Sequence, residues 1–207
     1  MKAEANKTAS EYFAASRDVV DRSRVDGQFM DALVRIADVW TKALRGGGKI
    51  LLAGNGGSAG DAQHIAGELL SRLNFDRPAL AGIALTTDTS VLTAIGNDYG
   101  FERVFERQVI GLGRPGDVFV GISTSGKSPN ILRALTVARH SELTTIGFTG
   151  QSGGAMLDLC DWCLRVPSQL TPLIQQIHIT AAHVICGLVE EELFGEESAA
   201  VRSRRAP

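Results

Sequence analysis

From Lys49 onward, the chain alternates short apolar runs with segments of helical periodicity, and this alternation limits the fold more than any other feature. Runs this short and continuously apolar are typical of strands buried on both faces of a parallel sheet. The five expected strands are Ile50–Gly54, Gly82–Thr86, Asp117–Ser123, Thr144–Thr149 and Trp162–Pro167. The helices expected between them are Asp61–Leu73, Thr89–Ile95, Phe101–Leu112, Asn130–His140 and Ala155–Leu159. This order predicts an α/β fold in three layers, with a doubly wound, five-stranded parallel sheet.

Further helices are expected on either side of this alternation. Apolar residues recur at helical spacing in Ser10–Arg24 and Gly27–Leu44, and no long linker follows, so we expect residues 1–47 to pack on the core formed by residues 48–195. A long final helix is expected over Pro172–Phe194. The tail, residues 196–207, has little to bury, and we expect it to be disordered.

Composition excludes several classes of protein. The 207 residues carry a net charge of −2, which gives no basic field for nucleic acid, and no apolar run approaches the length of a membrane span. The N-terminus lacks the apolar segment of a secretory signal. Three cysteines are an odd number for a disulfide framework, and the C-x-x-C pair Cys160 and Cys163 has only Cys186 as a further thiol, too few for a metal knuckle. We therefore expect a cytoplasmic protein with reduced, structural thiols and neither nucleic-acid nor membrane partners.

The loops after the expected strands concentrate small and hydroxylated residues. In doubly wound sheets, ligands bind at the carboxyl ends of the strands. Three of these loops, around Asn55–Ser58, Ser123–Asn130 and Thr149–Gly154, are rich in Gly, Ser or Thr and lead into a helix, which suits a phosphate. For any single loop, ordinary turns and N-caps are the more frequent explanation of this composition. The four hydroxyls within Ser123–Ser128 favour a phosphate-bearing small molecule.

Two nucleotide-binding patterns are nearly present, and both fail in detail. The segment Gly121–Ser128, GISTSGKS, formally matches the P-loop pattern, but no later strand ends in an aspartate that could hold magnesium. The dinucleotide pattern is missed because Gly54, Gly56 and Gly60 have one spacer too many. We therefore disfavour a nucleotide.

Histidines and a glutamate supply candidate chemistry on two helices. His64 and Glu68 are four residues apart, on one helical face, beside the apolar Ile65 and Leu69. Such a pair can bind a metal or transfer a proton. The alternative is that both residues simply belong to a polar, solvent-exposed face of the helix. His183 lies in an apolar stretch of the final helix, where a lone histidine is more often structural than catalytic.

Five motifs, taken together and in order, resemble a known family. They are AGNGGSAGDAQHIAGE, LTAIGNDYG, GDVFVGISTSGKSPN, FTGQSGG and IQQIH. The chain resembles the phosphoheptose isomerases of the sugar isomerase (SIS) domain group from about Ala53 to Phe194. This resemblance implies a flavodoxin-like sheet, a homotetramer with N-terminal helices at its subunit interfaces, one Zn²⁺ per subunit, and a sugar-phosphate loop at Ser123–Ser128.

The resemblance also assigns roles to individual residues. The implied zinc ligands are His64, Glu68, Gln175 and His183, and the implied acid–base pair is Glu68 and His183. The implied substrate-binding residues are Asn55, Gly56, Gly57, Ser58, Glu68, Asn97, Asp98, Ser123, Thr124, Ser125, Ser128 and Gln175. One departure is Gln176, where the family commonly has glutamate. Gln175 and His183 are eight residues apart, about 12 Å along a helix. Either Gln175 precedes the regular helix or two subunits share the site.

The implied reaction is aldose–ketose isomerisation. Sedoheptulose 7-phosphate would lose a proton, form an enediol and regain a proton to give D-glycero-D-manno-heptose 7-phosphate, the first step of nucleotide-activated heptose synthesis. Whether Glu68 acts as the base or mainly as a zinc ligand stays open. The alternatives are a non-catalytic SIS-domain regulator that binds a protein such as the replication initiator and, more weakly, a sugar-binding regulator. The presence of both Glu68 and His183 favours the enzyme.

Overall fold

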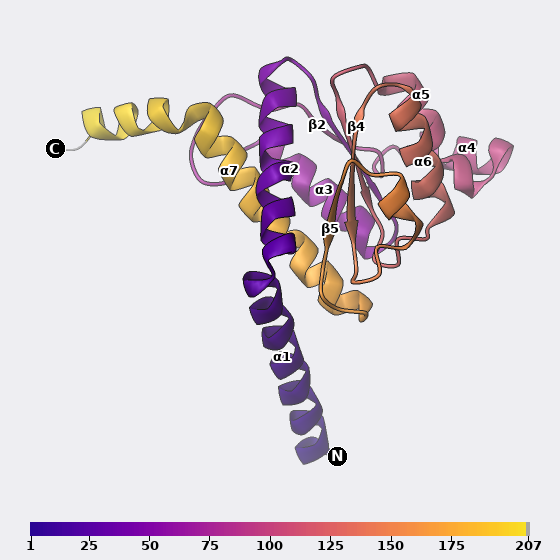
Figure 1. The fold of residues 1–207 in the computed structure, drawn as a ribbon, viewed down its shortest axis with the longest axis vertical. Coiled ribbons are helices and arrows are strands. Elements are labelled where there is room, and N and C mark those ends of the chain that lie inside the picture. Colours follow the sequence, from indigo (N-terminus) through magenta and orange to yellow (C-terminus); the bar gives the residue numbers. More distant parts are fainter. Residues whose placement is uncertain (206–207) are drawn as a thin grey trace.

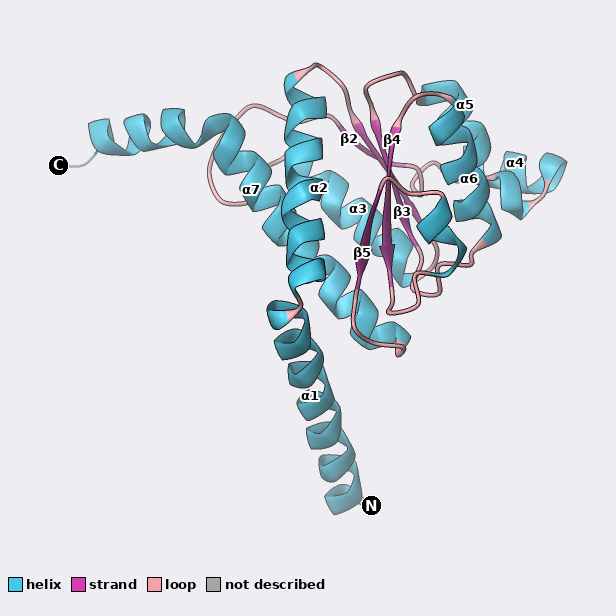
Figure 2. Ribbon diagram, in the orientation of Figure 1, coloured by secondary structure: helices cyan, strands magenta, loops and turns pink. Residues whose placement is uncertain are grey.

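A five-stranded parallel sheet forms the centre of the protein (Figures 1 and 2). The structure, a computed structural model, describes residues 1–205, and describes side chains within residues 1–196 apart from residue 3. The strands are β1 (Ile50–Gly54), β2 (Gly82–Ala84), β3 (Val118–Ile122), β4 (Thr144–Thr149) and β5 (Trp162–Arg165). The predicted five-stranded α/β fold is thus confirmed, with β2, β3 and β5 shorter than expected.

Successive strand residues face opposite layers of helices. In β1, Ile50 and Leu52 face one apolar cluster, whereas Leu51 and Ala53 face the other. The first cluster includes apolar residues of α2 (Gly27–Arg45), α3 (Gly57–Leu70) and α7 (Thr171–Arg205). The second includes apolar residues of α5 (Glu106–Leu112) and α6 (Pro129–His140). This arrangement is the three-layer packing that continuously apolar strands require.

The strand order β2-β1-β3-β4-β5 places the site region. The chain leaves β1 toward β2 on one side and then returns to β3 on the other side of β1. The switch point therefore lies between β1 and β3, and their carboxyl ends open into one crevice. Helix α3 begins at Gly57 and helix α6 at Pro129, directly after the two loops that line this crevice.

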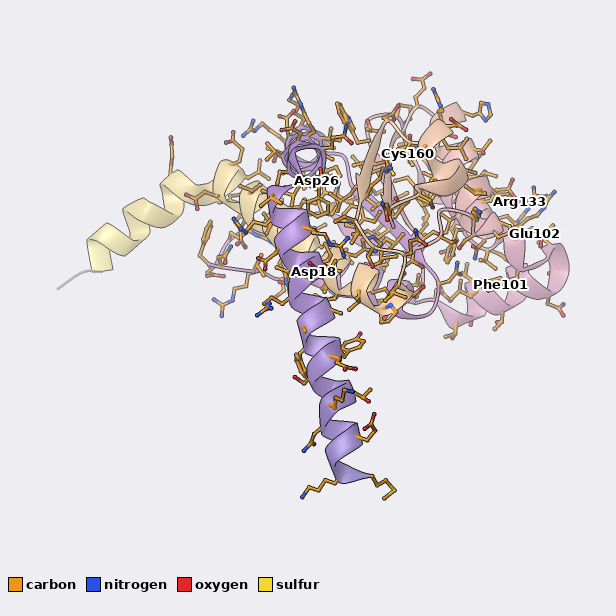
Figure 3. The ribbon with its side chains drawn as sticks, turned by 60° about the horizontal axis from the view of Figure 1, so that its bottom comes forward. Asp18, Asp26, Phe101, Glu102, Arg133 and Cys160 are labelled. Carbon is orange, nitrogen blue, oxygen red and sulfur yellow. The ribbon has the colours of Figure 1, made fainter. Side chains whose placement is uncertain are left out.

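The N-terminal helices meet at a sharp bend. Helix α1 (Lys2–Val25) begins earlier than expected and projects away from the body, whereas α2 packs on the sheet (Figure 1). Asp26 separates the two helices (Figure 3). Its carboxylate accepts hydrogen bonds from the backbone amides of Gln28 and Phe29. The aspartate thereby caps α2 and ends α1.

The segment after β2 differs from the prediction. Helix α4 (Thr89–Tyr99) buries none of its residues and extends to one side (Figure 1). The single helix expected over Phe101–Leu112 is instead a 3₁₀ turn, η1 (Phe101–Arg103), followed by α5. The expected helix at Ala155–Leu159 is also a 3₁₀ turn, η2 (Gly154–Asp158).

Helix α7 is longer than the predicted Pro172–Phe194 and begins at Thr171. Its stretch Thr171–Glu196 is apolar and long enough to cross a membrane, but half of its most apolar window is buried within the protein. The buried residues belong to the cluster on one face of the sheet, which identifies α7 as a core helix. The expected disorder of residues 196–207 stays a prediction, because residues 206–207 and the side chains from 197 onward lie outside the described part.

Candidate active site

A hollow of about 390 Å³ lies at the carboxyl ends of β1 and β3. Its walls carry no charged side chain, only amides, hydroxyls, glycines and one isoleucine. The lining residues are Asn55, Gly56, Gly57, Ser58, Ile122, Ser123, Thr124, Ser128, Thr171 and Gln175. We call this set the strand-end pocket. The N-termini of α3 and α6 adjoin it, so an anion here would meet backbone N–H groups and the positive ends of two helices.

Backbone contacts hold the hydroxyl loop of the pocket in place. Gly126 has φ +64°, and a Cβ added to it would overlap the carbonyl group of Gly153 in the neighbouring loop. The hydroxyl of Ser123 lies 2.9 Å from that of Ser128 and 3.4 Å from that of Ser125. Three hydroxyls therefore gather over one short loop whose backbone conformation only glycine adopts readily at position 126.

An amide pair joins the loops after β1 and β3. The side chain of Asn55 donates to Asn130 over 3.0 Å, and Asn130 donates back over 2.8 Å. Asn130 is only 2% exposed and lies in the first turn of α6. Asn130 was not among the predicted site residues, although its position directly after the hydroxyl loop could have indicated it.

Gln175 lies in the strand-end pocket. It lies inside α7, which begins at Thr171, so the alternative in which Gln175 precedes the regular helix is wrong. A site shared between two subunits stays a prediction. Its side-chain amide donates to the hydroxyl of Ser58 over 3.3 Å and packs against Gly57. The neighbouring Gln176 instead accepts a hydrogen bond from Ser16 of α1 over 2.7 Å.

His64, Glu68 and His183 form a second group, which we call the His–Glu–His cluster. Nε2 of His64 lies 3.1 Å from a carboxylate oxygen of Glu68 and 3.1 Å from Nε2 of His183. The two imidazole rings are tilted by 60° with centroids 5.0 Å apart. One ligand atom from each residue lies within 4.8 Å of the other two. Convergent imidazole nitrogens and a carboxylate are a donor set that suits Zn²⁺, so these residues fit a metal.

The pocket and the cluster lie along the same two helices. Ser58 meets Gln175, and six residues further along α3, His64 meets His183 of α7. Because both contacts advance in the same chain direction, α3 and α7 run parallel here, and the cluster lies roughly two turns beyond the pocket.

Asp61 is a charged residue beside the cluster that was not among the predicted site residues. It lies one turn before His64 on α3, and one of its carboxylate oxygens is buried without a hydrogen-bond partner among the described residues. Burial raises its pKa to about 6, although the nearby His64 lowers it in part. The i, i+3 spacing from His64 was the signal that could have found it.

Four expected substrate-binding residues do not line the strand-end pocket: Glu68, which belongs to the His–Glu–His cluster, and Asn97, Asp98 and Ser125. Asn97 and Asp98 lie on the exposed helix α4, where the amide of Asn97 donates to Asp98 over 2.8 Å. Ser125 is exposed at the tip of the hydroxyl loop, where its oxygen accepts from the backbone N–H of Lys127 over 3.2 Å. Within one chain, the structure thus brings together only part of the expected set.

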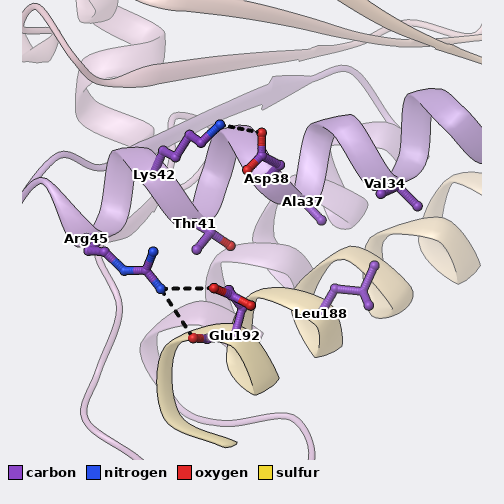
Figure 4. A pocket seen from close by; sticks show the side chains of 8 residues that line it. All are labelled: Val34, Ala37, Asp38, Thr41, Lys42, Arg45, Leu188 and Glu192. Atoms are coloured by element: carbon purple, nitrogen blue, oxygen red, sulfur yellow. Dashed lines mark hydrogen bonds and ion pairs between the residues drawn. The ribbon is translucent and has the colours of Figure 1, made fainter.

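Another hollow, of about 310 Å³, lies between α2 and α7 (Figure 4). Its charged side chains satisfy one another, because Lys42 pairs with Asp38 over 2.7 Å and Arg45 pairs with Glu192 over 3.2 Å. It lies away from the strand ends and has no convergent group of unpaired donors. We therefore do not assign it chemistry.

The cysteines behave as structural thiols. Cys160 and Cys163 both lie against Gly147 of β4, and burial raises the pKa of each thiol. Burial likewise raises the pKa of Cys186 to about 12. Protonated thiols are poor metal ligands and poor nucleophiles at neutral pH.

The fold and the strand-end pocket together define a sugar isomerase domain. The family model of the SIS domain matches residues 11–150. Phosphoheptose isomerase 2 of Campylobacter jejuni is 64% identical over 155 residues, covering 75% of this chain and 77% of the relative. The phosphoheptose isomerase of Burkholderia pseudomallei is 54% identical over 184 residues, covering 89% and 93%. The solved structure of the phosphoheptose isomerase from Neisseria gonorrhoeae is 41% identical and superposes with a TM-score of 0.84, covering 90% of this chain and 98% of that one.

The chain therefore belongs to the phosphoheptose isomerase family of SIS-domain proteins, which makes it an aldose–ketose sugar-phosphate isomerase. The resemblance inferred from the five motifs is confirmed.

Proposed function

We propose that the protein converts sedoheptulose 7-phosphate into D-glycero-D-manno-heptose 7-phosphate, the first step of nucleotide-activated heptose synthesis. The observation that carries the proposal is the pairing of an uncharged, glycine-lined pocket with a His–Glu–His cluster about two helical turns away on the same helices. Such a spacing suits a sugar held by its phosphate at one end and reacted at the other. A non-catalytic regulator would need the pocket but not the cluster.

The strand-end pocket would bind the 7-phosphate. Ser123, Thr124 and Ser128 supply hydroxyl donors, and the N-terminus of α6 favours a negative charge. Gly56 leaves the backbone open to the ligand, Gly57 lies against the side-chain amide of Gln175, and Asn55 and Ser58 lie beside them. In the assembled protein, Ser125, Asn97 and Asp98 would complete the substrate contacts.

Glu68 and His183 would move the protons. The reaction removes a proton from C1 of the ketose, forms an enediol and delivers a proton to C2. Glu68 and His183 each lie within 3.1 Å of the same His64 nitrogen, so a substrate carbon beside His64 would be within reach of both. Either group can serve as base, with the other as acid.

His64, Glu68 and His183 would hold a Zn²⁺ ion, with Gln175 as the fourth expected ligand. When bound, the ion would supply Lewis-acid polarisation of the substrate's carbonyl group. Within one chain, the side-chain amide of Gln175 is engaged with Ser58. Gln175 also lies eight residues before His183, about 12 Å along α7, so its service as a ligand would require both release from that hydrogen bond and a site shared between two subunits.

The protein would act as a cytoplasmic homotetramer. Helix α1 projects from the body with Tyr12, Phe13 and Val25 exposed, and α4 buries none of its residues. Apolar side chains on projecting helices are suited to packing against further copies of the chain. Such packing would also bring Asn97 and Asp98 of one subunit near another subunit.

The decisive experiment is turnover of sedoheptulose 7-phosphate by purified protein, together with metal analysis of the same sample. We expect formation of the heptose 7-phosphate and about one zinc per subunit. A zinc-loaded protein that binds the sugar phosphate but forms no product would favour the regulator.

A further inference from the structure

A buried ion pair joins the end of α3 to α7, beyond both the strand-end pocket and the His–Glu–His cluster. Nε of Arg77, in the loop after α3, donates to Glu190 of α7 over 3.0 Å. The two side chains are only 2% and 0% exposed. Neither residue touches the pocket, and neither is a candidate ligand or acid–base group.

Arg77 caps the helix that carries Glu68. Its two terminal nitrogens donate to the backbone carbonyls of Glu68 and Leu69, each over 2.7 Å. The last carbonyls of a helix have no partner within the helix, and a cation there is favourable. Because α3 ends at Leu70 and is followed by Ser71 rather than a glycine cap, the guanidinium group fixes the last turn of α3 from outside.

Glu190 fixes the other side of the same junction. Its carboxylate accepts hydrogen bonds from the backbone N–H groups of Leu73 over 2.9 Å and Asn74 over 2.8 Å, in addition to that of Arg77. Glu190 lies seven residues after His183, which is about two turns and nearly the same face of α7. The buried pair therefore spans the same two helices as the cluster.

We propose that Arg77, held by Glu190, is a positioning residue that sets the register of Glu68 on α3 against His183 on α7. The inference rests on the metal-binding role proposed above for the cluster. The ligands of the cluster come from two helices, so they converge only when α3 and α7 keep a fixed axial offset and a fixed rotation relative to each other. Arg77 hydrogen-bonds the backbone of Glu68 itself and ion-pairs with the helix that carries His183. It therefore provides a direct hydrogen-bonded link between α3 and α7.

The chain offers a matched control on the same helix. Arg45 and Glu192 form a second arginine–glutamate pair between α2 and α7, and their side chains are 56% and 64% exposed. This pair uses the same residue types but contacts neither α3 nor the cluster. The substitutions Arg77→Lys and Arg45→Lys therefore make the same chemical change at a linked and an unlinked position.

The experiment measures Co²⁺ binding to the metal-free full-length protein by titration and visible absorption, with the urea unfolding midpoint of each variant recorded alongside. Lysine at position 77 keeps the positive charge, but its single nitrogen cannot replace the planar fork in which three separate nitrogens reach the two carbonyls and the carboxylate. We expect Arg77→Lys and Glu190→Gln to weaken Co²⁺ binding by about 10- to 100-fold, as outer-shell changes do, and to alter the absorption spectrum. Arg45→Lys should leave affinity and spectrum unchanged.

The outcomes separate positioning from simple stabilisation. Wild-type affinity and spectrum in Arg77→Lys, with a lowered unfolding midpoint, would overturn the inference. Failure of both variants to fold would also overturn it, because the pair would then be a requirement of the fold. If the wild-type protein itself binds no Co²⁺, the proposed metal site fails. That result is distinct from a wild type that binds metal and variants that bind it equally well.

Discussion

The strand-end pocket and the His–Glu–His cluster lie on the same pair of helices but are built in different ways. The pocket has buried side chains in its walls, since Ser58 and Ser123 are each 4% exposed, and interlocked backbone loops fix its shape. In the cluster, by contrast, the side chain of His64 is 48% exposed and that of Glu68 is 19% exposed. The comparison teaches that the pocket is set by the sheet topology, whereas the cluster depends on how two helices pack.

The largest effect should come from Glu68→Gln, which changes the cluster but not the pocket. The substitution keeps the shape of the side chain and removes the carboxylate proposed to move a proton. We expect turnover of sedoheptulose 7-phosphate to fall by roughly 10²- to 10⁴-fold. Metal content measured on the same sample separates loss of the base from loss of a ligand. A near wild-type kcat would remove Glu68 from the acid–base pair.

Ser125→Asp tests the hydroxyl loop beside the pocket without touching the cluster. Its carboxylate would stand at the loop proposed to bind the phosphate, and like charges brought together cost several kcal/mol. We therefore expect affinity for sedoheptulose 7-phosphate to fall by more than about 100-fold in calorimetric titration.

Two controls accompany that variant. Ser125→Ala loses one neutral hydrogen bond, worth about 0.5–1.5 kcal/mol, and should weaken binding only modestly. Unphosphorylated sedoheptulose should bind the wild type poorly. If both sugars bind the wild type equally, or if Ser125→Asp binds the phosphate as the wild type does, the phosphate lies elsewhere.

His64→Ala tests whether the cluster can be lost while the pocket survives. Zinc sites with four protein ligands bind with about 10–16 kcal/mol in total, so losing one ligand should weaken metal binding by about 100-fold. The fold should change little, because the side chain of His64 is nearly half exposed. Metal stoichiometry and thermal unfolding of the variant are the measurements. Unchanged stoichiometry would exclude His64 as a ligand.

The smallest expected effect concerns His178, which lies on α7 between Gln175 and His183. It is fully buried and bonds the carbonyl of Thr149 over 3.1 Å. Burial lowers its pKa to about 4, although the hydrogen bond to Thr149 raises it in part. Below pH 6.5 the unfolded chain therefore takes up a proton that the folded protein does not, and stability falls as the pH falls toward 4.

Between pH 7 and pH 5, the difference between the pKa of His178 in the folded and in the unfolded chain should lower the free energy of unfolding by about 2 kcal/mol, because one pKa unit corresponds to about 1.4 kcal/mol. Urea unfolding at the two pH values measures the change. In His178→Gln, which has no titrating group at this position, the pH dependence should be smaller by that amount. An equal pH dependence in both proteins would contradict a neutral, buried His178.

The sequence by itself determined the parts that local chemistry encodes. Continuous apolar runs predicted all five strands, because strands buried on both faces need apolar residues at every position. The glycine and hydroxyl composition of the loops predicted the pocket, because a parallel sheet gathers its carboxyl ends on one edge. The i, i+4 spacing of His64 and Glu68 likewise placed two members of the cluster on one face of α3.

Only the tertiary structure decided which distant residues meet these local features. His183 reaches His64 across 119 positions of the chain, and Glu190 reaches Arg77 across 113. The same packing brings the side chain of Gln175 next to that of Ser58 and leaves α4, with Asn97 and Asp98, outside the pocket. Periodicity shows that a helix has a buried face but not its register against a partner. That register is fixed by close packing of apolar side chains on α3, α7 and the sheet, together with the buried pair that joins the end of α3 to α7.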